Sequence, residues 1–176
     1  MRNKDEEIIA DSFQRINMKE RYKSLIVRDW KPKDRYVAAE VIKIVLEEYG
    51  LPWQPESADR DVIEVESAYL DAGGEFWVVE QDSTIVGTAA YQPIARGHRA
   101  VEIRKMYLLP RIRGRGLGKY LLGQLEIAIA IKDYQEIWIE TASILKEAVK
   151  LYELNGYQPA NGVETERCDL VYRKQL

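Results

Sequence analysis

The chain has 176 residues, of which 46% are hydrophobic and 31% charged, and its formal net charge is −3. This length suffices for one domain with a real core and is short for two, and the slightly negative total argues against a general affinity for nucleic acid or an anionic membrane. The single cysteine, Cys168, cannot form an internal disulfide, and no apolar run approaches the roughly 20 residues that span a bilayer.

The start of the chain differs in composition from the rest. Residues 1–24 are highly charged and contain few apolar side chains. We expect them to form a helical or loosely docked extension outside a single domain of residues 25–176. Acidic residues also stand where a signal peptide would carry its apolar segment, so a cytoplasmic location is expected.

The hydrophobic period changes along the chain between helical and extended. Helical spacing ends at Gly50 and again at the pair Asn155-Gly156, which is typical of a helix C-terminus. Alternating segments with turn residues between them indicate strands. The expected elements are a strand at 24–30, helices at 32–50 and 59–70, strands within 75–93 and at 100–109, a helix at 117–128, a strand at 136–141, a helix at 143–156 and a strand at 166–176.

Residues 104–122, with the sequence RKMYLLPRIRGRGLGKYLL, run from a strand through three glycines into a helix. Backbone N–H groups at a helix N-terminus have no partner within the helix, and glycine leaves them open to an anion. The surrounding stretch, from Arg96 to Lys119, contains eight basic residues and the single acid Glu102. The glycines therefore predict a site for an anion, and a plain surface turn is the alternative.

Two familiar phosphate-binding patterns do not fit these glycines. A P-loop ending on Gly118 and Lys119 would need glycine and serine or threonine where the chain has Arg113 and Tyr120. A dinucleotide-binding fingerprint has the spacing G-x-G-x-x-G, whereas the chain has G-x-G-x-G after a strand that follows other strands.

The stretch resembles the acyl-coenzyme A loop of the GNAT superfamily of N-acetyltransferases. That loop has arginine or glutamine, two residues, glycine, one residue, and glycine or alanine, a pattern that Arg113, Gly116 and Gly118 match. The likeness extends from residue 25 to the C-terminus. It implies an α/β fold, α+β in some schemes, with a mixed, mostly antiparallel sheet flanked by helices, in which the family's fourth and fifth strands splay apart for acyl-CoA.

The resemblance implies a site for acetyl-CoA as cosubstrate. A bulged fourth strand would pair with the pantetheine arm, and amides of the glycine loop would hold the pyrophosphate. Many members carry an asparagine near this site where the chain has Leu145, and Thr141 is a candidate to line the cleft. The implied residues are Met106, Tyr107 and Leu108 in the strand, and Arg113, Gly114, Arg115, Gly116, Leu117, Gly118 and Lys119 in the loop.

Two further positions match residues that carry chemistry in this family. Glu102 stands where many members have a glutamate that acts as general base, and Tyr152 stands at the tyrosine that protonates the departing thiolate. In a regular strand Glu102 would share a face with Met106, a parity that a bulge would break. The alternatives are that Glu102 neutralises Arg104 and Lys105 or binds the substrate's ammonium, and that Tyr152 is a core aromatic.

The implied reaction is transfer of an acetyl group from acetyl-CoA to a primary amine of a small molecule or peptide by direct attack. No acyl-enzyme is expected, since Cys168 lies in the last strand, away from these motifs. The alternative is a non-catalytic acyl-CoA-binding or regulatory module, against which the presence of both Glu102 and Tyr152 counts.

The remaining partners are less defined by the sequence. No nucleic acid, membrane or metal is expected, because the basic residues lack interleaved aromatics and the one histidine, His98, has no cysteine or second histidine beside it. A homodimer stays open. Acidic residues near the second helix would favour a cationic acceptor such as a polyamine, or would only solvate a helix face; they are Asp59, Asp61, Glu64 and Glu66.

Overall fold

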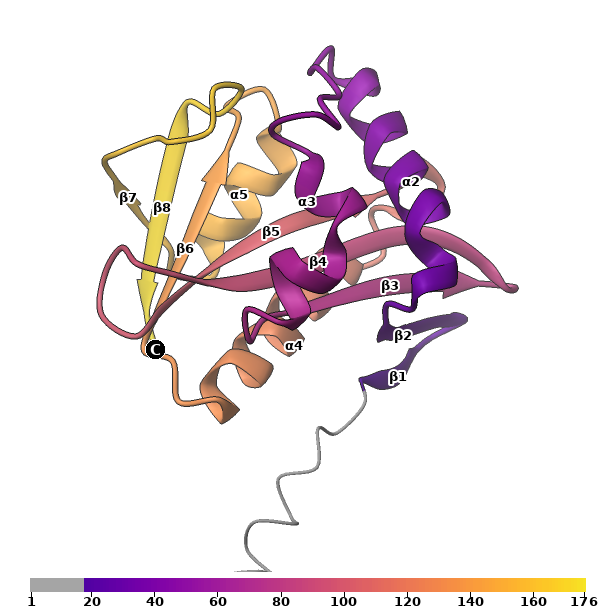
Figure 1. Cartoon of the computed structure of the whole chain (residues 1–176), viewed down its shortest axis with the longest axis horizontal. Coiled ribbons are helices and arrows are strands. Elements are labelled where there is room, and N and C mark those ends of the chain that lie inside the picture. Colours follow the sequence, from indigo (N-terminus) through magenta and orange to yellow (C-terminus); the bar gives the residue numbers. More distant parts are fainter. Residues whose placement is uncertain (1–17) are drawn as a thin grey trace, which may run out of the picture.

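The computed structural model describes residues 18–176 (Figure 1). In chain order its elements are β1 (Lys19–Tyr22), β2 (Leu25–Asp29), η1 (Pro32–Asp34), α2 (Arg35–Glu48), α3 (Arg60–Ile63), η2 (Glu66–Leu70), β3 (Glu75–Gln81), β4 (Thr84–Ile94), β5 (Ala100–Leu108), η3 (Pro110–Ile112), α4 (Leu117–Ile131), β6 (Glu136–Thr141), α5 (Lys146–Leu154), β7 (Gln158–Ala160) and β8 (Leu170–Gln175).

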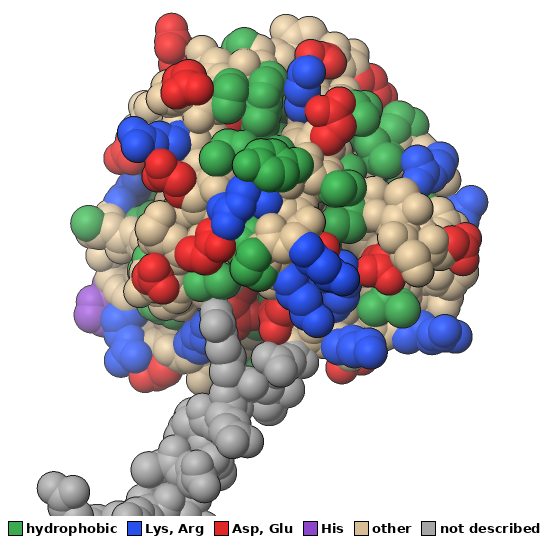
Figure 2. Space-filling model, turned by 45° about the vertical axis from the view of Figure 1, so that its right-hand side comes forward, with side chains coloured by type: hydrophobic (Ala, Val, Ile, Leu, Met, Phe, Trp, Pro, Cys, Tyr) green, Lys and Arg blue, Asp and Glu red, His purple; other side chains and the backbone are tan. Residues whose placement is uncertain are grey.

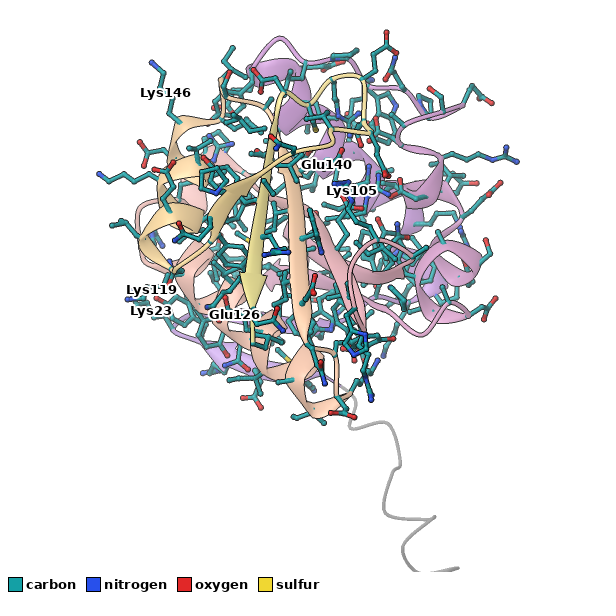
Figure 3. All side chains as sticks on the ribbon, turned by 90° about the vertical axis from the view of Figure 1, so that its left-hand side faces the viewer. Lys23, Lys105, Lys119, Glu126, Glu140 and Lys146 are labelled. Carbon is teal, nitrogen blue, oxygen red and sulfur yellow. The ribbon has the colours of Figure 1, made fainter. Side chains whose placement is uncertain are left out.

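The strands form one sheet of eight, in the order β1-β2-β3-β4-β5-β6-β8-β7. Neighbouring strands are antiparallel except β5 and β6, which are parallel. Helices α2 and α3 lie on one side of the sheet, and α4 and α5 lie on the other (Figure 1, Figure 3). The expected mixed, mostly antiparallel sheet flanked by helices is confirmed.

The core lies where helices cover both faces of the central strands. Residues 85–91 of β4 are all buried, as a strand covered on both faces requires. Helix α2 buries a stripe that recurs every three or four residues and includes Ala38, Val41, Ile42 and Val45. Charged side chains of both signs are interspersed over the surface shown in Figure 2, in line with the small net charge. Within residues 18–176, no helix is long and apolar enough to cross a membrane.

Part of the predicted N-terminal extension belongs to the sheet. Strand β1 pairs along its whole length with β2, and the turn between them uses Lys23 in the left-handed region, with φ of 55°. Residues 18–24 therefore form a hairpin with the first expected strand. The remainder of the extension, residues 1–17, lies outside the described residues.

Two expected helices differ in extent. The predicted helix at 59–70 is divided into α3 and η2 because the Arg35 side chain donates to the carbonyl of Ile63 and pairs with Glu66. The predicted helix at 143–156 begins three residues later, as α5, since the backbone N–H and the hydroxyl of Ser143 both donate to Asp169 at 2.6 Å.

Candidate active site

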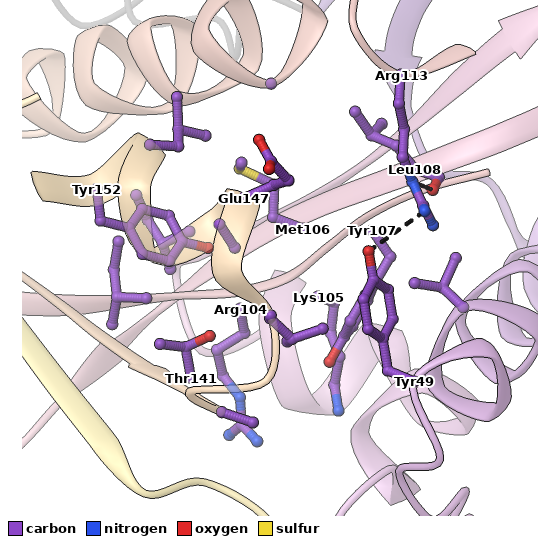
Figure 4. Close-up of a pocket in the computed structure, with 18 of the residues that line it drawn as sticks. Tyr49, Arg104, Lys105, Met106, Tyr107, Leu108, Arg113, Thr141, Glu147 and Tyr152 are labelled. Atoms are coloured by element: carbon purple, nitrogen blue, oxygen red, sulfur yellow. Dashed lines mark hydrogen bonds between the residues drawn. The ribbon is translucent and has the colours of Figure 1, made fainter. Parts of the chain in front are cut away.

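The sheet opens between β5 and β6. The last residues of the two strands in register are Glu102 and Trp138, yet β5 continues to Leu108 and β6 to Thr141. These correspond to the two strands that the GNAT resemblance expects to splay apart, and their divergence is confirmed. A cavity of about 380 Å³ lies at this opening and is lined by both strands, by the glycine loop and by α5 (Figure 4).

Strand β5 carries a bulge at the cavity. Tyr107 pairs with Thr88 and Arg104 pairs with Ala90, so that two residues of β5 lie opposite one residue of β4. Lys105, one of those two, has φ of 52°, a left-handed conformation that is uncommon for a residue other than glycine. The bulge interrupts the alternation of side chains along β5.

The interruption separates the two groups of predicted residues on this strand. Met106, Tyr107 and Leu108, which we predict to hold the pantetheine arm, line the cavity, whereas Glu102 is not among the lining residues. A regular strand would have placed Glu102 and Met106 on one face. The bulge therefore places Glu102 and Met106 on opposite faces of β5.

A buried ionic cluster, formed by Asp59, Lys105 and Arg167, holds the bulge in place. The ammonium of Lys105 lies 2.7 Å from Asp59 Oδ1, and the guanidinium of Arg167 donates to both oxygens of Asp59 at 2.6 Å. Asp59 has no exposed surface. Burial alone would raise the pKa of Asp59, but Arg167 and Lys105 lower it below its ordinary value. Three segments, the start of α3, the bulge and the loop before β8, are thus tied together.

The glycine loop ends as the N-terminus of α4. Gly114 and Gly116 both have positive φ, 72° and 79°. Because α4 begins at Leu117, the amides of its first turn have no partner within the helix, and no described side chain caps Gly116. Gly114, Gly116, Leu117, Gly118 and Lys119 line the cavity, and Arg115 does not.

Arg113 is committed to contacts within the protein. Its backbone N–H donates to the carbonyl of Pro110, its guanidinium donates to both oxygens of Glu48 at 2.7 Å, and its Nε donates to the carbonyl of Leu108 at 2.8 Å. Arg113 lines the cavity, but these bonds indicate that it fastens the loop to α2 and β5. The neighbouring guanidinium also lowers the pKa of Glu48.

The hairpin of β1 and β2 supports the loop from outside. The carbonyl of Arg115 accepts hydrogen bonds from the Tyr22 hydroxyl at 2.8 Å and from Lys23 Nζ at 2.9 Å. The rings of Tyr22 and Tyr120 stack with centroids 4.4 Å apart. Lys23 and Lys119 project from the same corner of the molecule (Figure 3). Sequence reasoning missed Tyr22 and Lys23 because it assigned them to the extension.

Tyr152 lies on the cavity side of α5. Its side chain is 5% exposed, it lines the cavity together with Thr141 and Leu145, and its hydroxyl points toward the centre of the pocket (Figure 4). Burial raises the pKa of Tyr152 well above its ordinary value, and the nearby Tyr107 adds to the effect. The hydroxyl therefore keeps its proton at neutral pH, as a proton donor must.

Glu102 lies beside the cavity, near Arg104. Its carboxylate is 3.9 Å from Arg104 Nη1, and its side chain is 16% exposed. Burial raises the pKa of Glu102, Glu140 raises it further, and Arg104 opposes the shift. A carboxylate with a raised pKa is a better proton acceptor near neutral pH than an ordinary one.

Cys168 is closer to the motifs than the sequence indicated. It precedes β8 and lines the cavity together with Tyr152, so the expectation that it lies away from the motifs is wrong. Burial raises the pKa of the Cys168 thiol to about 11. A protonated thiol is a poor nucleophile. Among residues 18–176, no three His, Cys, Asp or Glu side chains gather in a way that could hold a metal ion.

Comparisons with known proteins agree with this geometry. The family described as Acetyltransferase (GNAT) matches residues 38–157. The uncharacterized N-acetyltransferase YjgM of Escherichia coli (strain K12) is 33% identical over 138 residues, which are 77% of this chain and 83% of that protein.

Solved structures share the fold. A GNAT-family acetyltransferase of Staphylococcus aureus Mu50 superimposes with a TM-score of 0.79 and 18% identity, over 86% of this chain and 98% of that chain. YncA of Salmonella typhimurium, solved with its cofactor acetyl-CoA, gives a TM-score of 0.69 and 19% identity, over 87% of this chain and 94% of that chain. The chain therefore belongs to the GNAT family of acetyltransferases, and it is an acyltransferase that uses acetyl-CoA.

Proposed function

We propose that this enzyme transfers the acetyl group of acetyl-CoA to the primary amine of a small molecule or peptide by direct attack. The observation that carries the proposal is that the buried hydroxyl of Tyr152, the bulge of β5 and the glycine loop all line one cavity. A binding module would need the loop and the bulge but not a protonated tyrosine aimed at the space between them.

The cavity offers acetyl-CoA a strand edge and unpaired backbone amides. Free edges of β5 at residues 106–108 would pair with the amides of the pantetheine arm, and first-turn amides of α4 would hold the pyrophosphate. Glycine at position 116 keeps the Tyr22 support of this loop intact, since a Cβ would come 2.9 Å from the Tyr22 hydroxyl oxygen. When bound, acetyl-CoA supplies a thioester whose carbon is open to attack by an amine.

Two side chains would move the protons. An amine arrives protonated at neutral pH, and Glu102 would take its proton directly or through a water molecule. As the new N–C bond forms and the C–S bond breaks, the Tyr152 hydroxyl would protonate the departing sulfur. Most of the remaining acceleration would come from holding amine and thioester together.

The test is an acetylation screen with the purified enzyme. It would be incubated with acetyl-CoA and a mixed library of amines, with thiol release and the mass of each acetylated product as readouts. We expect at least one amine to be acetylated, and Tyr152→Phe to slow its acetylation while leaving acetyl-CoA binding intact. Binding of acetyl-CoA without thiol release for any amine would favour the binding-module alternative.

A further inference from the structure

The acidic residues near α3 do not leave a surplus of negative charge. Asp59 is shared between Lys105 and Arg167, and Asp61 lies 3.1 Å from the Lys105 ammonium. On the exposed side, Glu64 pairs with Arg60 and Glu66 with Arg35. These carboxylates are neutralised within the protein, so they are poor candidates for binding a polycationic acceptor.

Glu140 of β6 is committed in the same way. It lies 2.9 Å from the Arg96 guanidinium and accepts hydrogen bonds from the amides of Glu164 and Thr165 at 2.9 and 2.8 Å. It therefore anchors the loop between β7 and β8 and has little capacity left for a ligand. Near the opening between β5 and β6, Glu102 and Arg104 remain to be considered.

Arg104 is a largely buried cation with few partners. Its side chain is 22% exposed and it lines the cavity, but its nearest carboxylate oxygens, in Asp61 and Glu102, lie 3.7 and 3.9 Å away. With the amide of Gln92 turned so that both its ends are satisfied, Arg104 Nη1 donates to that side chain at 3.0 Å. A guanidinium has five N–H donors. Within residues 18–176 the other donors are joined to no acceptor at hydrogen-bonding distance, and the Nε only approaches Asp61 at 3.7 Å.

Glu102 is similarly unsatisfied. Its carboxylate accepts no hydrogen bond from the described residues, and its closest cation is the same Arg104 at 3.9 Å. The two residues are two positions apart on β5 and thus project from one face of the strand before the bulge. The opening between β5 and β6 therefore presents one loosely paired carboxylate and one loosely paired guanidinium side by side.

We infer that the acceptor is a zwitterionic amine, an amino acid or a close derivative, whose carboxylate binds Arg104 while its amino group faces Glu102. This rests on the proposed function. The planar fork of a guanidinium matches a carboxylate in two hydrogen bonds, and burial strengthens such a pair. In an amino acid the amino group and the carboxylate are close together, as Glu102 and Arg104 are on β5. A protein N-terminus and a polyamine have the amino group but lack that carboxylate.

The inference predicts a ranking of acceptors. Hydrogen bonds to a charged group are worth about 1.5–3 kcal/mol, so an acceptor without the carboxylate should lose about 10- to 100-fold in kcat/KM. The ranking should hold for amino acids with different side chains. The KM for acetyl-CoA should not follow this ranking, because Arg104 lies before the bulge that serves the pantetheine site.

The experiment compares matched acceptors with wild-type enzyme and two variants. Each amino acid is tested beside its carboxamide and its decarboxylated amine, for instance phenylalanine, phenylalaninamide and phenethylamine. Arg104→Met should raise the acceptor KM and abolish the ranking without changing the KM for acetyl-CoA, and Arg104→Lys should restore part of it. Arg173→Met is the matched control, since Arg173 lies over Trp138 on an exposed position outside the cavity lining.

The outcomes separate this inference from the proposed function. If carboxamides and simple amines are acetylated as well as the amino acids, the inference is overturned and the proposed acetyl transfer stands. Retention of the ranking by Arg104→Met would also overturn it. If no amine releases thiol although acetyl-CoA binds, the proposed function itself fails. If the melting curve shows that Arg104→Met does not fold, the wild-type enzyme alone tests the inference: a preference for amino acids over their carboxamides supports it, and equal acetylation overturns it.

Discussion

The hydroxyl of Tyr22 donates a hydrogen bond of 2.8 Å to the carbonyl of Arg115, 93 residues further along the chain. In a trans peptide the carbonyl and the following N–H point in opposite directions. By holding the Arg115 carbonyl on the hairpin side, Tyr22 directs the N–H of Gly116 to the other side. An edge hairpin thereby helps to orient the amides of the glycine loop.

Tyr22→Phe should weaken acetyl-CoA binding through this hydrogen bond. A single hydrogen bond contributes about 0.5–1.5 kcal/mol, so we expect the KM for acetyl-CoA to rise about two- to tenfold with little change in kcat. The thioester S-acetylpantetheine lacks the pyrophosphate and should be used equally well by both enzymes. Equal losses with both donors would show that Tyr22 does not act on the pyrophosphate loop. Tyr36→Phe, at a position that is 78% exposed, is the matched control.

Gly116→Ala should damage both stability and cofactor binding. At φ of 79° a side chain costs about 1–2 kcal/mol, and the new Cβ would come 2.9 Å from the Tyr22 hydroxyl oxygen. Gly123→Ala, inside α4 with open space around its Cβ, should instead stabilise the protein by about 0.5–1 kcal/mol. Chemical denaturation and acetyl-CoA titration of both variants check this. The prediction is wrong if the two substitutions have the same effect.

Tyr152→Phe should lower kcat by about 10²–10⁴ while acetyl-CoA still binds, because general acid catalysis is typically of that size. Tyr157→Phe is a suitable control. Its ring lies 5.9 Å from that of Tyr152, but its hydroxyl donates to Glu126 and it does not line the cavity. Steady-state rates and binding titrations are the measurements. Nearly full activity in Tyr152→Phe would exclude the hydroxyl as the proton donor.

The pH dependence of kcat should reflect the protonation of Glu102. A general base must be deprotonated to act, and the pKa of Glu102 is raised above the ordinary value of about 4.3 by its burial. We therefore expect kcat, at saturating substrates, to fall on the acid side at a higher pH than an exposed glutamate would give. Glu102→Gln should lower kcat and remove this limb. An unchanged limb in Glu102→Gln would assign it to another group.

Asp59→Asn should destabilise the fold, since it leaves Arg167 buried without its counter-ion and Lys105 with Asp61 alone. Breaking a buried pair in this way costs about 3–5 kcal/mol. Glu64→Gln, in the exposed pair with Arg60, should cost less than about 1 kcal/mol. Urea denaturation of both variants makes the comparison, and similar losses in the two would mean that the buried cluster does not hold the bulge.

Acid should remove the contribution of Asp59. Its pKa is lowered in the folded protein, so its stabilisation is present above the unfolded value of about 3.9 and is lost as the pH falls through the lower folded pKa. The stability difference between wild type and Asp59→Asn should accordingly shrink below about pH 4. A difference that stays constant through this range would contradict the lowered pKa.

The parts of the site that could be predicted are those that depend on residues close together in the sequence. The glycines, the preceding strand and the following helix are close together in the sequence, so their arrangement as a strand, a turn and a helix N-terminus is a local property. The contacts of single side chains are not a local property, because the partner can be far away in the sequence. Arg113 matched a motif, yet its guanidinium binds Glu48 of α2, 65 residues earlier, which no spacing rule could indicate.

By itself, the sequence predicted the order of the main elements, without β1 and β7, together with the glycine loop and the candidate roles of Glu102 and Tyr152, because these depend on periodicity and motif spacing. Tertiary structure decided that β1 joins the sheet, that Asp59 and Asp61 are neutralised by Lys105 and Arg167, and that Cys168 reaches the cavity. It also left Arg104 and Glu102 loosely paired beside the cavity. Such outcomes depend on which distant side chains meet after folding, since burial and pairing, not residue type, set how much charge remains for a ligand.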